Sequence, residues 1–314
     1  MIEIQHLVKK YGNNTAVNDL SMVLKAGKVY GFLGPNGAGK STTMNMITGY
    51  IGATSGEIII NGHDIRKEPA AAKKCIGYLP EVPPLYMDMT VEEYLKFAAE
   101  LKQLNKHTRY ADMKQAMELT KITDVKNRMI RNLSKGYRQR VGLAQAILGF
   151  PEIIILDEPT AGLDPKQIIE IRDLIKSLSQ KHTVILSSHI LSEISEVCDY
   201  VFIISKGRLA ADDTVENLKQ KLSGDAVFEL ILKASEEEVS FLQDLKGVAS
   251  CHVTAGRQEG TVNVKMAAKS GEDFREDLFY ACVQNDTPIL QMQPVSHSLE
   301  EVFLEVTGEK EEQK

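Results

Sequence analysis

The sequence predicts an α/β fold built around a mainly parallel sheet, followed by a smaller α+β domain. Over the first 220 residues, short apolar runs rich in β-branched residues alternate with longer runs of helical periodicity, which is typical of a sheet flanked by helices. After Leu222-Ser223-Gly224 the order becomes strand, helix, strand, strand, helix, strand. The chain has 314 residues, enough for two domains at roughly 100–200 residues each. We expect these domains to span 1–224 and 225–314.

The first domain is expected to carry a helical insertion between its strands. Thr90 and Glu93 have the spacing of a capping box, which predicts a helix over Glu92–Leu104. A second helix is expected over Ala111–Leu119, and no strand signal occurs between Thr90 and Phe150. We therefore expect a helical subdomain over about 82–150. The strands expected on either side of it are Lys28–Leu33, Glu57–Ile60, Ile153–Leu156, Thr183–Ser187 and Tyr200–Ser205.

The second domain has the order βαββαβ, which predicts a ferredoxin-like sandwich. Residues 256–260, Gly-Arg-Gln-Glu-Gly, supply the turn between its middle strands. A short helix over Ser298–Val306 is expected to close the domain, and the charged tail Gly308–Lys314 is expected to fray. The other expected elements are the strands Ala226–Leu232, Val248–Thr254, Thr261–Met266 and Ile289–Pro294, and the helices Ser235–Leu245 and Glu272–Asn285.

Charge and composition exclude several classes of protein. The formal net charge is −6, divided into +4 for residues 1–224 and −10 for residues 225–314. Because nucleic-acid binding needs clustered Lys and Arg, the acidic second half argues against a nucleic-acid partner. No run approaches the roughly 20 apolar residues of a membrane span, and the start of the chain lacks a signal-peptide pattern, so we expect a cytoplasmic protein. The four cysteines form no CxxC pair, which argues against a metal knuckle or a disulfide framework.

A glycine-rich segment provides the main functional signal. Residues 34–41 match G-x-x-x-x-G-K-[ST] and lie directly between the apolar run Val29–Leu33 and a helical run that starts at Thr42. In this context the backbone N–H groups wrap a polyphosphate, the helix offers its positive end, Lys40 reaches the terminal phosphates and Ser41 can bind Mg²⁺. The expected nucleotide-binding residues are Gly34, Pro35, Asn36, Gly37, Ala38, Gly39, Lys40, Ser41 and Thr42.

Two adjacent carboxylates follow the apolar run Ile153–Leu156. Open α/β sheets bind ligands at the carboxyl ends of their strands, so Asp157 and Glu158 are expected beside the glycine-rich segment. Asp157 is the expected partner of Mg²⁺, directly or through water, and Glu158 is the candidate that polarises the attacking water.

A further segment, Leu133-Ser134-Lys135-Gly136-Tyr137, resembles the signature motif LSGGQ of the ATP-binding cassette (ABC) ATPases. It departs from that motif at Lys135 and Tyr137 and retains Ser134 and Gly136 at the expected start of a helix, where a hydroxyl and N–H groups can meet a γ-phosphate. The resemblance covers about residues 2–220. It implies a P-loop ABC ATPase with a RecA-like core, antiparallel N-terminal strands and a helical subdomain.

Other residues match the family's motifs in order. By resemblance, Tyr11 stacks on adenine, Ala161-Gly162-Leu163-Asp164 is the D-loop, and His189 is the switch histidine that senses the γ-phosphate, so that Glu158, His189 and Lys40 form the catalytic set. Glu81 occupies the place of the Q-loop glutamine. A carboxylate binds Mg²⁺ more strongly than an amide but adds negative charge beside a triphosphate, so Glu81 is expected to join Ser41 and Asp157 as a metal ligand.

The resemblance also implies how such a chain works. In that family the signature of a second, head-to-tail subunit completes each ATP site, so the chain is expected to form a homodimer or heterodimer of ATPase subunits and to drive a separately encoded transmembrane permease from the cytoplasmic face of the membrane. GYLPE, LSKGYRQR and the segment 298–303 favour subunits of ABC-2 type exporters over importers. The cofactors implied are ATP and Mg²⁺. The C-terminal domain is expected to regulate or support the dimer, and a small-ligand sensor is the alternative.

Two alternatives remain from the sequence. The first is a soluble ABC ATPase that acts on nucleic acid or ribosomes. Such proteins usually carry two cassettes or a long coiled-coil insertion, and neither is present in the sequence. The second is a chain that binds ATP but scarcely hydrolyses it, which the presence of both Glu158 and His189 disfavours.

Overall fold

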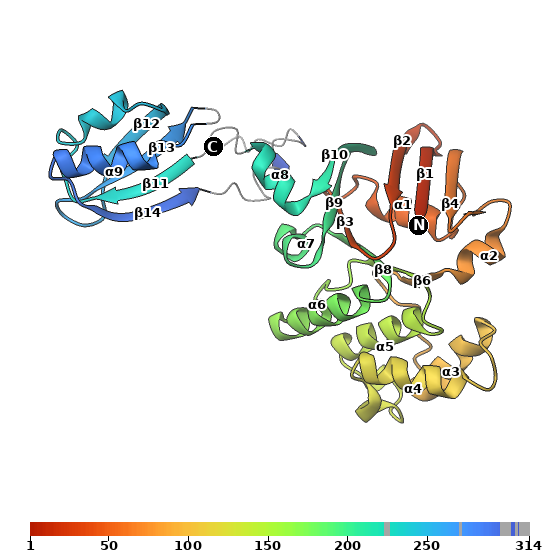
Figure 1. The fold of residues 1–314 in the computed structure, drawn as a ribbon. Helices are drawn as coiled ribbons and strands as arrows, with labels where there is room; N and C mark the ends of the chain where they lie inside the picture. Colours follow the sequence, from red (N-terminus) through yellow and green to blue (C-terminus); the bar gives the residue numbers. More distant parts are fainter. Residues whose placement is uncertain (223–226, 270–271, 296–302, 305–306, 308–314) are drawn as a thin grey trace. The chain divides into compact units, whose positions relative to one another are not determined.

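The computed structural model describes residues 1–222, 227–269, 272–295, 303, 304 and 307 (Figure 1). The chain divides into two compact units, one of Met1–Val215 with Phe303–Lys314 and one of Glu216–Val302. The expected domain boundary at residue 224 and the expected closing helix Ser298–Val306 fall largely outside the described residues, so both stay predictions, as does the expected fraying of the tail.

A six-stranded sheet forms the core of the first unit. Its strand order is β10-β9-β3-β8-β7-β6, and every pairing is parallel except that of β10 with β9. All residues of β3, β7 and β8 are buried, which explains why these strands are continuous apolar runs in the sequence. The four strands predicted here are confirmed, and β6 and β10 were not predicted. The bounds are β3 Val29–Leu33, β6 Ile76–Leu79, β7 Ile153–Asp157, β8 Thr183–Ser188, β9 Tyr200–Ser205 and β10 Arg208–Thr214.

A second, antiparallel sheet contains the N-terminal strands in the order β2-β1-β4-β5. We expected Glu57–Ile60 among the strands of the mainly parallel sheet, and this placement is wrong: β4 pairs antiparallel with β1, with Ile2 opposite Ile60. In β4 the burial alternates, with Ile58 and Ile60 buried and Glu57 exposed, as expected for a sheet with one solvated face. The bounds are β1 Ile2–Tyr11, β2 Asn14–Leu24, β4 Ser55–Ile60 and β5 His63–Asp64.

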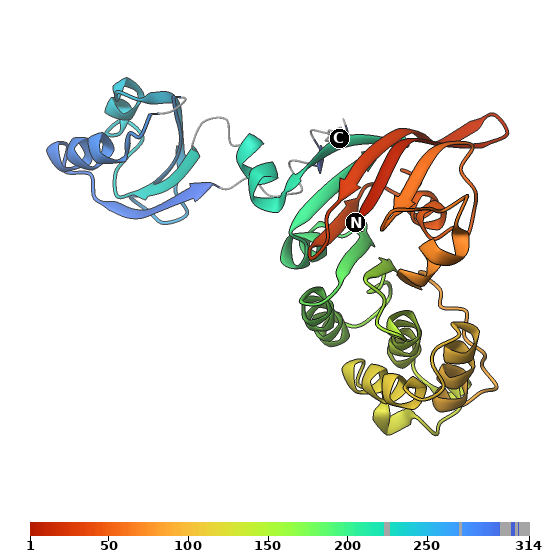
Figure 2. The ribbon, with the colours of Figure 1, turned by 45° about the vertical axis from the view of Figure 1, so that its right-hand side comes forward.

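The expected helical subdomain is present as α3 (Val91–Leu101), α4 (Arg109–Leu119) and α5 (Lys135–Ile147). It gathers away from the N-terminal sheet (Figure 2). The predicted capping box is confirmed: the Glu93 carboxylate accepts from the Thr90 N–H at 2.8 Å, and the Thr90 hydroxyl accepts from the Glu93 N–H at 3.3 Å. This pair fixes the start of α3.

The Lys102 amine joins α3 to the end of α5. It donates to the carbonyl oxygens of Gln145, Ala146 and Leu148 at 2.8, 3.0 and 3.1 Å, groups that a helix leaves without a backbone partner at its C-terminus. Burial lowers the pKa of Lys102 to about 8. The contact holds α5, and with it the signature segment at its first turn, in a fixed place within the subdomain.

The described part of the first unit also contains the α-helices α1, α2, α6 and α7, and α8 follows β10 and lies mostly in the second unit. The helix α1 follows β3 and begins at Lys40, and α7 follows β8 closely. The bounds are α1 Lys40–Ile47, α2 Pro69–Lys74, α6 Pro165–Ser179, α7 Leu191–Val197 and α8 Val215–Leu222.

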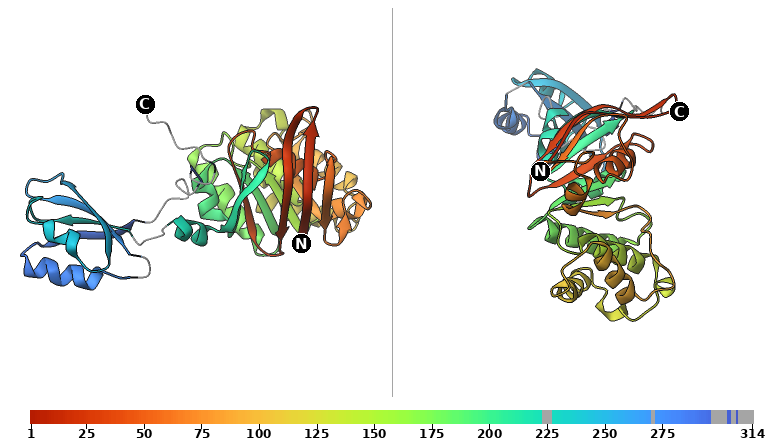
Figure 3. Two further views of the ribbon diagram at one scale, coloured as in Figure 1. Left: turned by 90° about the horizontal axis from the view of Figure 1, so that it is seen from above. Right: turned by 90° about the vertical axis from the view of Figure 1, so that its right-hand side faces the viewer.

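The second unit has a four-stranded antiparallel sheet in the order β12-β13-β11-β14, the order of a ferredoxin-like sandwich. The helix α9 covers one face of it (Figure 3), and residues 256–260 form the predicted hairpin, in which the Gly256 N–H donates to the Thr261 carbonyl. The bounds are β11 Val227–Leu232, β12 Val248–Ala255, β13 Val262–Ala268, α9 Arg275–Gln284 and β14 Ile289–Val295.

The predicted helix Ser235–Leu245 is wrong. The segment forms only a short 3-10 helix, Ser240–Asp244. Its buried apolar residues, Val239 and Leu242, are three positions apart, a spacing that occurs in a 3-10 helix as well as in an α-helix. In addition, no helix among the residues that the structure describes is long and apolar enough to cross a bilayer.

Candidate active site

The glycine-rich loop after β3 leads directly into α1. Gly39 precedes the helix with a φ of +107° and no side chain caps the helix start, so the N–H groups of the first turn keep their donor capacity for a ligand. A Cβ on Gly39 would lie 2.6 Å from the carbonyl oxygen of Ala16. This position therefore requires glycine, and the open helix start is a binding place for an anion.

Lys40 extends over this loop rather than into solvent. It is 6% exposed, and its amine donates to the carbonyl oxygens of Gly34 and Pro35 at 2.6 and 3.2 Å. Burial lowers the pKa of Lys40, and the nearby carboxylates of Glu158 and Asp157 oppose that shift. The site thus contains one buried cation facing two carboxylates.

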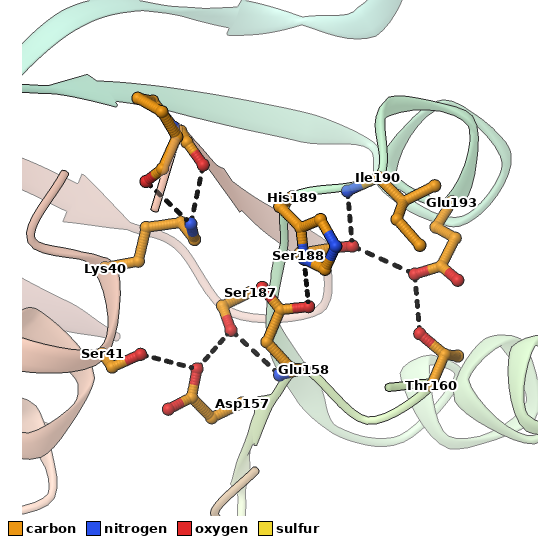
Figure 4. A network of polar contacts seen from close by, with 12 residues as sticks. Lys40, Ser41, Asp157, Glu158, Thr160, Ser187, Ser188, His189, Ile190 and Glu193 are labelled. Carbon is orange, nitrogen blue, oxygen red and sulfur yellow. Dashed lines mark hydrogen bonds and ion pairs between the residues drawn. The ribbon is translucent and has the colours of Figure 1, made fainter. Parts of the chain in front are cut away.

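The carboxyl ends of β7 and β8 place Asp157 opposite Ser187. The Ser187 hydroxyl donates to the Asp157 carboxylate and accepts from the Glu158 N–H at 3.0 Å. The Ser41 hydroxyl donates to the same Asp157 oxygen at 3.3 Å (Figure 4). The serine after Lys40 and the carboxylate at the end of β7 therefore meet, as the sequence predicts for a pair beside bound phosphate.

Glu158 and His189 form the second contact of the site. The Nδ1 atom of His189 lies 2.9 Å from Oε2 of Glu158, and Glu158 is 8% exposed. Burial raises the pKa of Glu158, while His189 and then Lys40 lower it. The backbone of Glu158 has a φ of +47°, a strained conformation for a residue other than glycine, and such strain concentrates at functional sites.

These residues surround a cavity of about 260 Å³. The cavity brings together residues that are up to 173 positions apart in the chain, because it is bordered by both Ala16 and His189. Its position at the ends of the parallel strands is where open α/β sheets bind ligands. The lining residues are Ala16, Asn36, Gly37, Gly39, Lys40, Ser41, Thr42, Glu81, Glu158, Ala161 and His189.

The other predicted site residues lie elsewhere. Gly34, Pro35 and Ala38 form the turn of the glycine-rich loop, where the Ala38 N–H donates to the Pro35 carbonyl at 3.1 Å. Tyr11 is 50% exposed at the end of β1, with the Lys9 amine 5.0 Å from its ring centroid. Neither it nor the signature residues border the cavity, so the predicted contact of Tyr11 with adenine stays a prediction.

The signature residues Ser134 and Gly136 lie at the start of α5. The Ser134 hydroxyl accepts from the Tyr137 N–H at 3.4 Å and so caps the helix. Gly136 lies against the side chain of Gln167 in α6, because a Cβ there would be 2.4 Å from its Oε1. Their contact with a phosphate stays a prediction.

The donor set beside Asp157 suits Mg²⁺. The Ser41 hydroxyl and the Asp157 carboxylate converge, and the exposed Glu81 borders the same cavity. Among the described residues no group of three or more His, Cys, Asp or Glu could hold a metal ion by itself. The Ser41 hydroxyl and the Asp157 carboxylate are oxygen donors of the kind through which Mg²⁺ binds, together with phosphate oxygens and water.

Four buried polar residues beside the site were not predicted: Thr160, Ser187, Ser188 and Glu193. Thr160 and Ser188 both donate to the Glu193 carboxylate, at 2.7 and 3.0 Å. One feature of the sequence could have indicated Glu193. This residue lies four positions after His189, in the first turn of a helix in which Ile194 and Val197 are buried apolar residues.

Comparison with known proteins identifies the family of this site. Residues 17–161 match the family model described as ABC transporter. The linearmycin resistance ATP-binding protein LnrL of Bacillus subtilis (strain 168) is 33% identical over 98% of this chain and 98% of its own length. The bacitracin transport ATP-binding protein BcrA of Bacillus licheniformis is also 33% identical, over 98% of this chain and 97% of its own.

Solved structures agree with this assignment. A structure described as the ATP binding subunit of an ABC transporter has a TM-score of 0.65 and 30% sequence identity, and the match covers 71% of this chain and 93% of that one. The glycine-rich loop, the carboxylates after β7 and the histidine after β8 are thus arranged on the fold that the relatives share. The chain belongs to the ABC transporter ATP-binding proteins and is an ATP-hydrolysing subunit of that family.

Proposed function

We propose that the chain powers an ABC-2 type exporter by closing and opening an ATP-dependent dimer at the cytoplasmic face of the membrane. The observation that carries the proposal is the composition of the cavity. It gathers the glycine-rich loop, Lys40, Glu158 and His189, whereas Ser134 and Gly136 do not border it. A bound triphosphate therefore has donors from one side, and a second subunit would supply the signature donors from the other.

Within one protomer, the backbone N–H groups between Asn36 and Thr42 and the Lys40 amine bind the phosphates. Lys40 is now bonded to two carbonyls of its own loop, and it would exchange these for phosphate oxygens. Glu158 polarises the attacking water as a general base, since its raised pKa brings it closer to working pH than an exposed glutamate. His189 orients that carboxylate through the 2.9 Å contact and senses the γ-phosphate.

Ser41, Asp157 and Glu81 would hold Mg²⁺ beside the phosphates. The metal supplies charge neutralisation at the phosphate oxygens. The protein's own contribution is the placement of the ligands: Ser187 donates to Asp157 and thereby fixes the carboxylate that faces Ser41.

The signature residues are positioned for a phosphate held by the partner. The exposed Ser134 caps α5, and Gly136 lies in the first turn of this helix, where the helix dipole favours an anion. The four negative charges that ATP carries are then shared by two helix starts from two subunits. The partner is a second copy or a related ATPase subunit, and ATP acts as a switch of dimer affinity.

The exporter assignment rests on the relatives and on the sequence motifs. The two relatives carry the names bacitracin transport and linearmycin resistance ATP-binding protein, and both match this chain along nearly its whole length, including the C-terminal unit. A separately encoded permease is the expected partner. The acidic second half, with a formal charge of −10 over residues 225–314, is not suited to nucleic acid, and we propose that it regulates or supports the dimer.

Purification of the tagged chain from its own host tests this function. We expect the chain in the membrane fraction, together with an integral membrane protein. That protein should have about six apolar segments of roughly 20 residues each. A strain lacking the chain should lose export, and only an ATP-hydrolysing form should restore it. If the chain instead sediments with ribosomes or nucleic acid and leaves export unchanged when deleted, the soluble ABC ATPase is the correct alternative.

The dependence of the ATPase rate on pH should reveal the contact between His189 and Glu158. Since His189 lowers the pKa of Glu158 against the effect of burial, replacing the histidine leaves that carboxyl more easily protonated. In His189→Ala the acidic limb of the kcat profile is expected to move to higher pH, in addition to a lower maximal rate. Stopped assays between pH 5 and 9 measure it. An unmoved acidic limb would contradict the proposed role of Glu158 as the base.

A further inference from the structure

Glu193 is a buried carboxylate at the first turn of α7 that does not border the cavity. It is 2% exposed, and its Oε2 atom accepts from the Thr160 hydroxyl at 2.7 Å and from the Ser188 hydroxyl at 3.0 Å. Both donors are buried as well. Among the described residues no cation lies within ion-pair distance of this carboxylate. A carboxylate is costly to bury unless hydrogen bonds compensate it, and here the compensation comes from two loops.

Those two loops are the ones that carry Glu158 and His189. Thr160 stands two positions after Glu158, and Ser188 directly precedes His189. The Ser188 hydroxyl also accepts from the Ile190 N–H at 3.0 Å, so it spans His189 on both sides (Figure 4). Glu193 therefore joins the segment after β7 to the last residue of β8.

A second link lies on the other side of the same contact. Ser187 accepts from the Glu158 N–H and donates to Asp157, so the pair of Glu158 and His189 lies between two buried connections. The Ser187 link holds the N–H of Glu158 but not the chain beyond it. Because Glu158 has a left-handed φ of +47°, the following turn needs a restraint of its own to persist, and Thr160 is the residue of that turn that Glu193 holds.

We propose that Glu193 is a positioning residue for ATP hydrolysis. It locks the Thr160 turn to the Ser188 turn and so keeps the Glu158 carboxylate and the His189 ring in one relative geometry. The same turn leads to Asp164, which caps α6 by accepting from the Gln167 N–H at 2.9 Å. The inference rests on the proposed roles of Glu158 and His189.

Three substitutions test the inference at single hydrogen bonds. Thr160→Val and Ser188→Ala each remove one hydroxyl with little change of volume, and Glu193→Gln keeps an oxygen that can accept from both. We expect kcat to fall about tenfold in Thr160→Val and in Ser188→Ala while KM for ATP stays within about twofold, because geometry at the water is lost and nucleotide binding is not. Glu193→Gln should keep kcat within about threefold of the wild-type rate.

Glu193→Ala completes the design as a double-mutant cycle with Thr160→Val. If the two side chains act as one link, the double variant is no slower than Glu193→Ala alone. If Glu193→Ala does not fold, Thr160→Val and Ser188→Ala decide the matter by themselves. Wild-type kcat in both of these, or an equal change in kcat and KM, overturns the positioning role.

Glu158→Gln, measured in the same assays, separates this inference from the proposed function. Loss of hydrolysis in Glu158→Gln together with wild-type rates in Thr160→Val and Ser188→Ala overturns only the role of Glu193. Wild-type hydrolysis in Glu158→Gln overturns the proposed role of Glu158, whatever the other variants do.

Discussion

Glu158→Gln is expected to lose ATP hydrolysis by about 100-fold or more while still binding ATP, and to accumulate as an ATP-bound dimer. The glutamine has the same shape but cannot take a proton from the attacking water, and general-base groups contribute typically 10²- to 10⁴-fold to rate. The binding groups, the glycine-rich loop and Lys40, are unchanged. With ATP and Mg²⁺ the variant should elute as a dimer on size-exclusion chromatography, and as a monomer without nucleotide.

The matched control for this variant is Glu118→Gln, the same chemical change on the exposed face of α4, where the side chain is 56% exposed. It should hydrolyse ATP at the wild-type rate and show no trapped dimer. A Glu158→Gln protein that binds ATP but stays monomeric would count against the dimer mechanism. One that still hydrolyses ATP would show that another group activates the water.

The second large effect is expected from the signature serine. Ser134→Arg should abolish hydrolysis, because a long cation replaces the cap of α5 at the surface proposed to face the partner's phosphate. Binding of the first nucleotide, measured by fluorescence titration, should be spared, since Ser134 does not border the chain's own cavity. Lys40→Ala should instead lose binding itself, because the buried amine is the only lysine that lines the described part of that cavity.

Mixing these two inactive variants distinguishes sites made by two subunits from sites made by one. A mixed dimer pairs the intact Lys40 of one protomer with the intact Ser134 of the other. At equal concentrations half of the dimers are mixed and each holds one complete site, so about a quarter of the wild-type rate should return. Two preparations that remain inactive separately and regain activity together support a shared site.

If the Ser134→Arg variant alone lost ATP binding and ATP hydrolysis equally, Ser134 would have a different role.

Much of the fold and the site could be predicted from the sequence. The strands of the parallel sheet are continuous apolar runs because both faces are buried, and the glycine-rich loop follows one of them. Parallel strands end at a common edge, so Lys40, Glu158 and His189 could be expected together, and the structure places all three around one cavity. The capping box of α3 could also be predicted, because it depends only on residues that are three positions apart.

What the sequence could not give depends on contacts between distant segments. Glu57–Ile60 is an apolar run like the others, and only its pairing with β1 places it in the antiparallel sheet. The short 3-10 helix at Ser240–Asp244 replaced an expected α-helix because its apolar spacing fits either period over so few residues. Glu193 is charged, and its side chain type predicts exposure to solvent. It is buried because the hydroxyls of Thr160 and Ser188 donate hydrogen bonds to it.

The most direct measurement is a crystal structure of Glu158→Gln with ATP and Mg²⁺. We predict two copies arranged head to tail, with the Ser134 hydroxyl of one copy within hydrogen-bond distance of the γ-phosphate bound at Lys40 of the other. A nucleotide enclosed by a single polypeptide, with Ser134 remote from every phosphate, would contradict it.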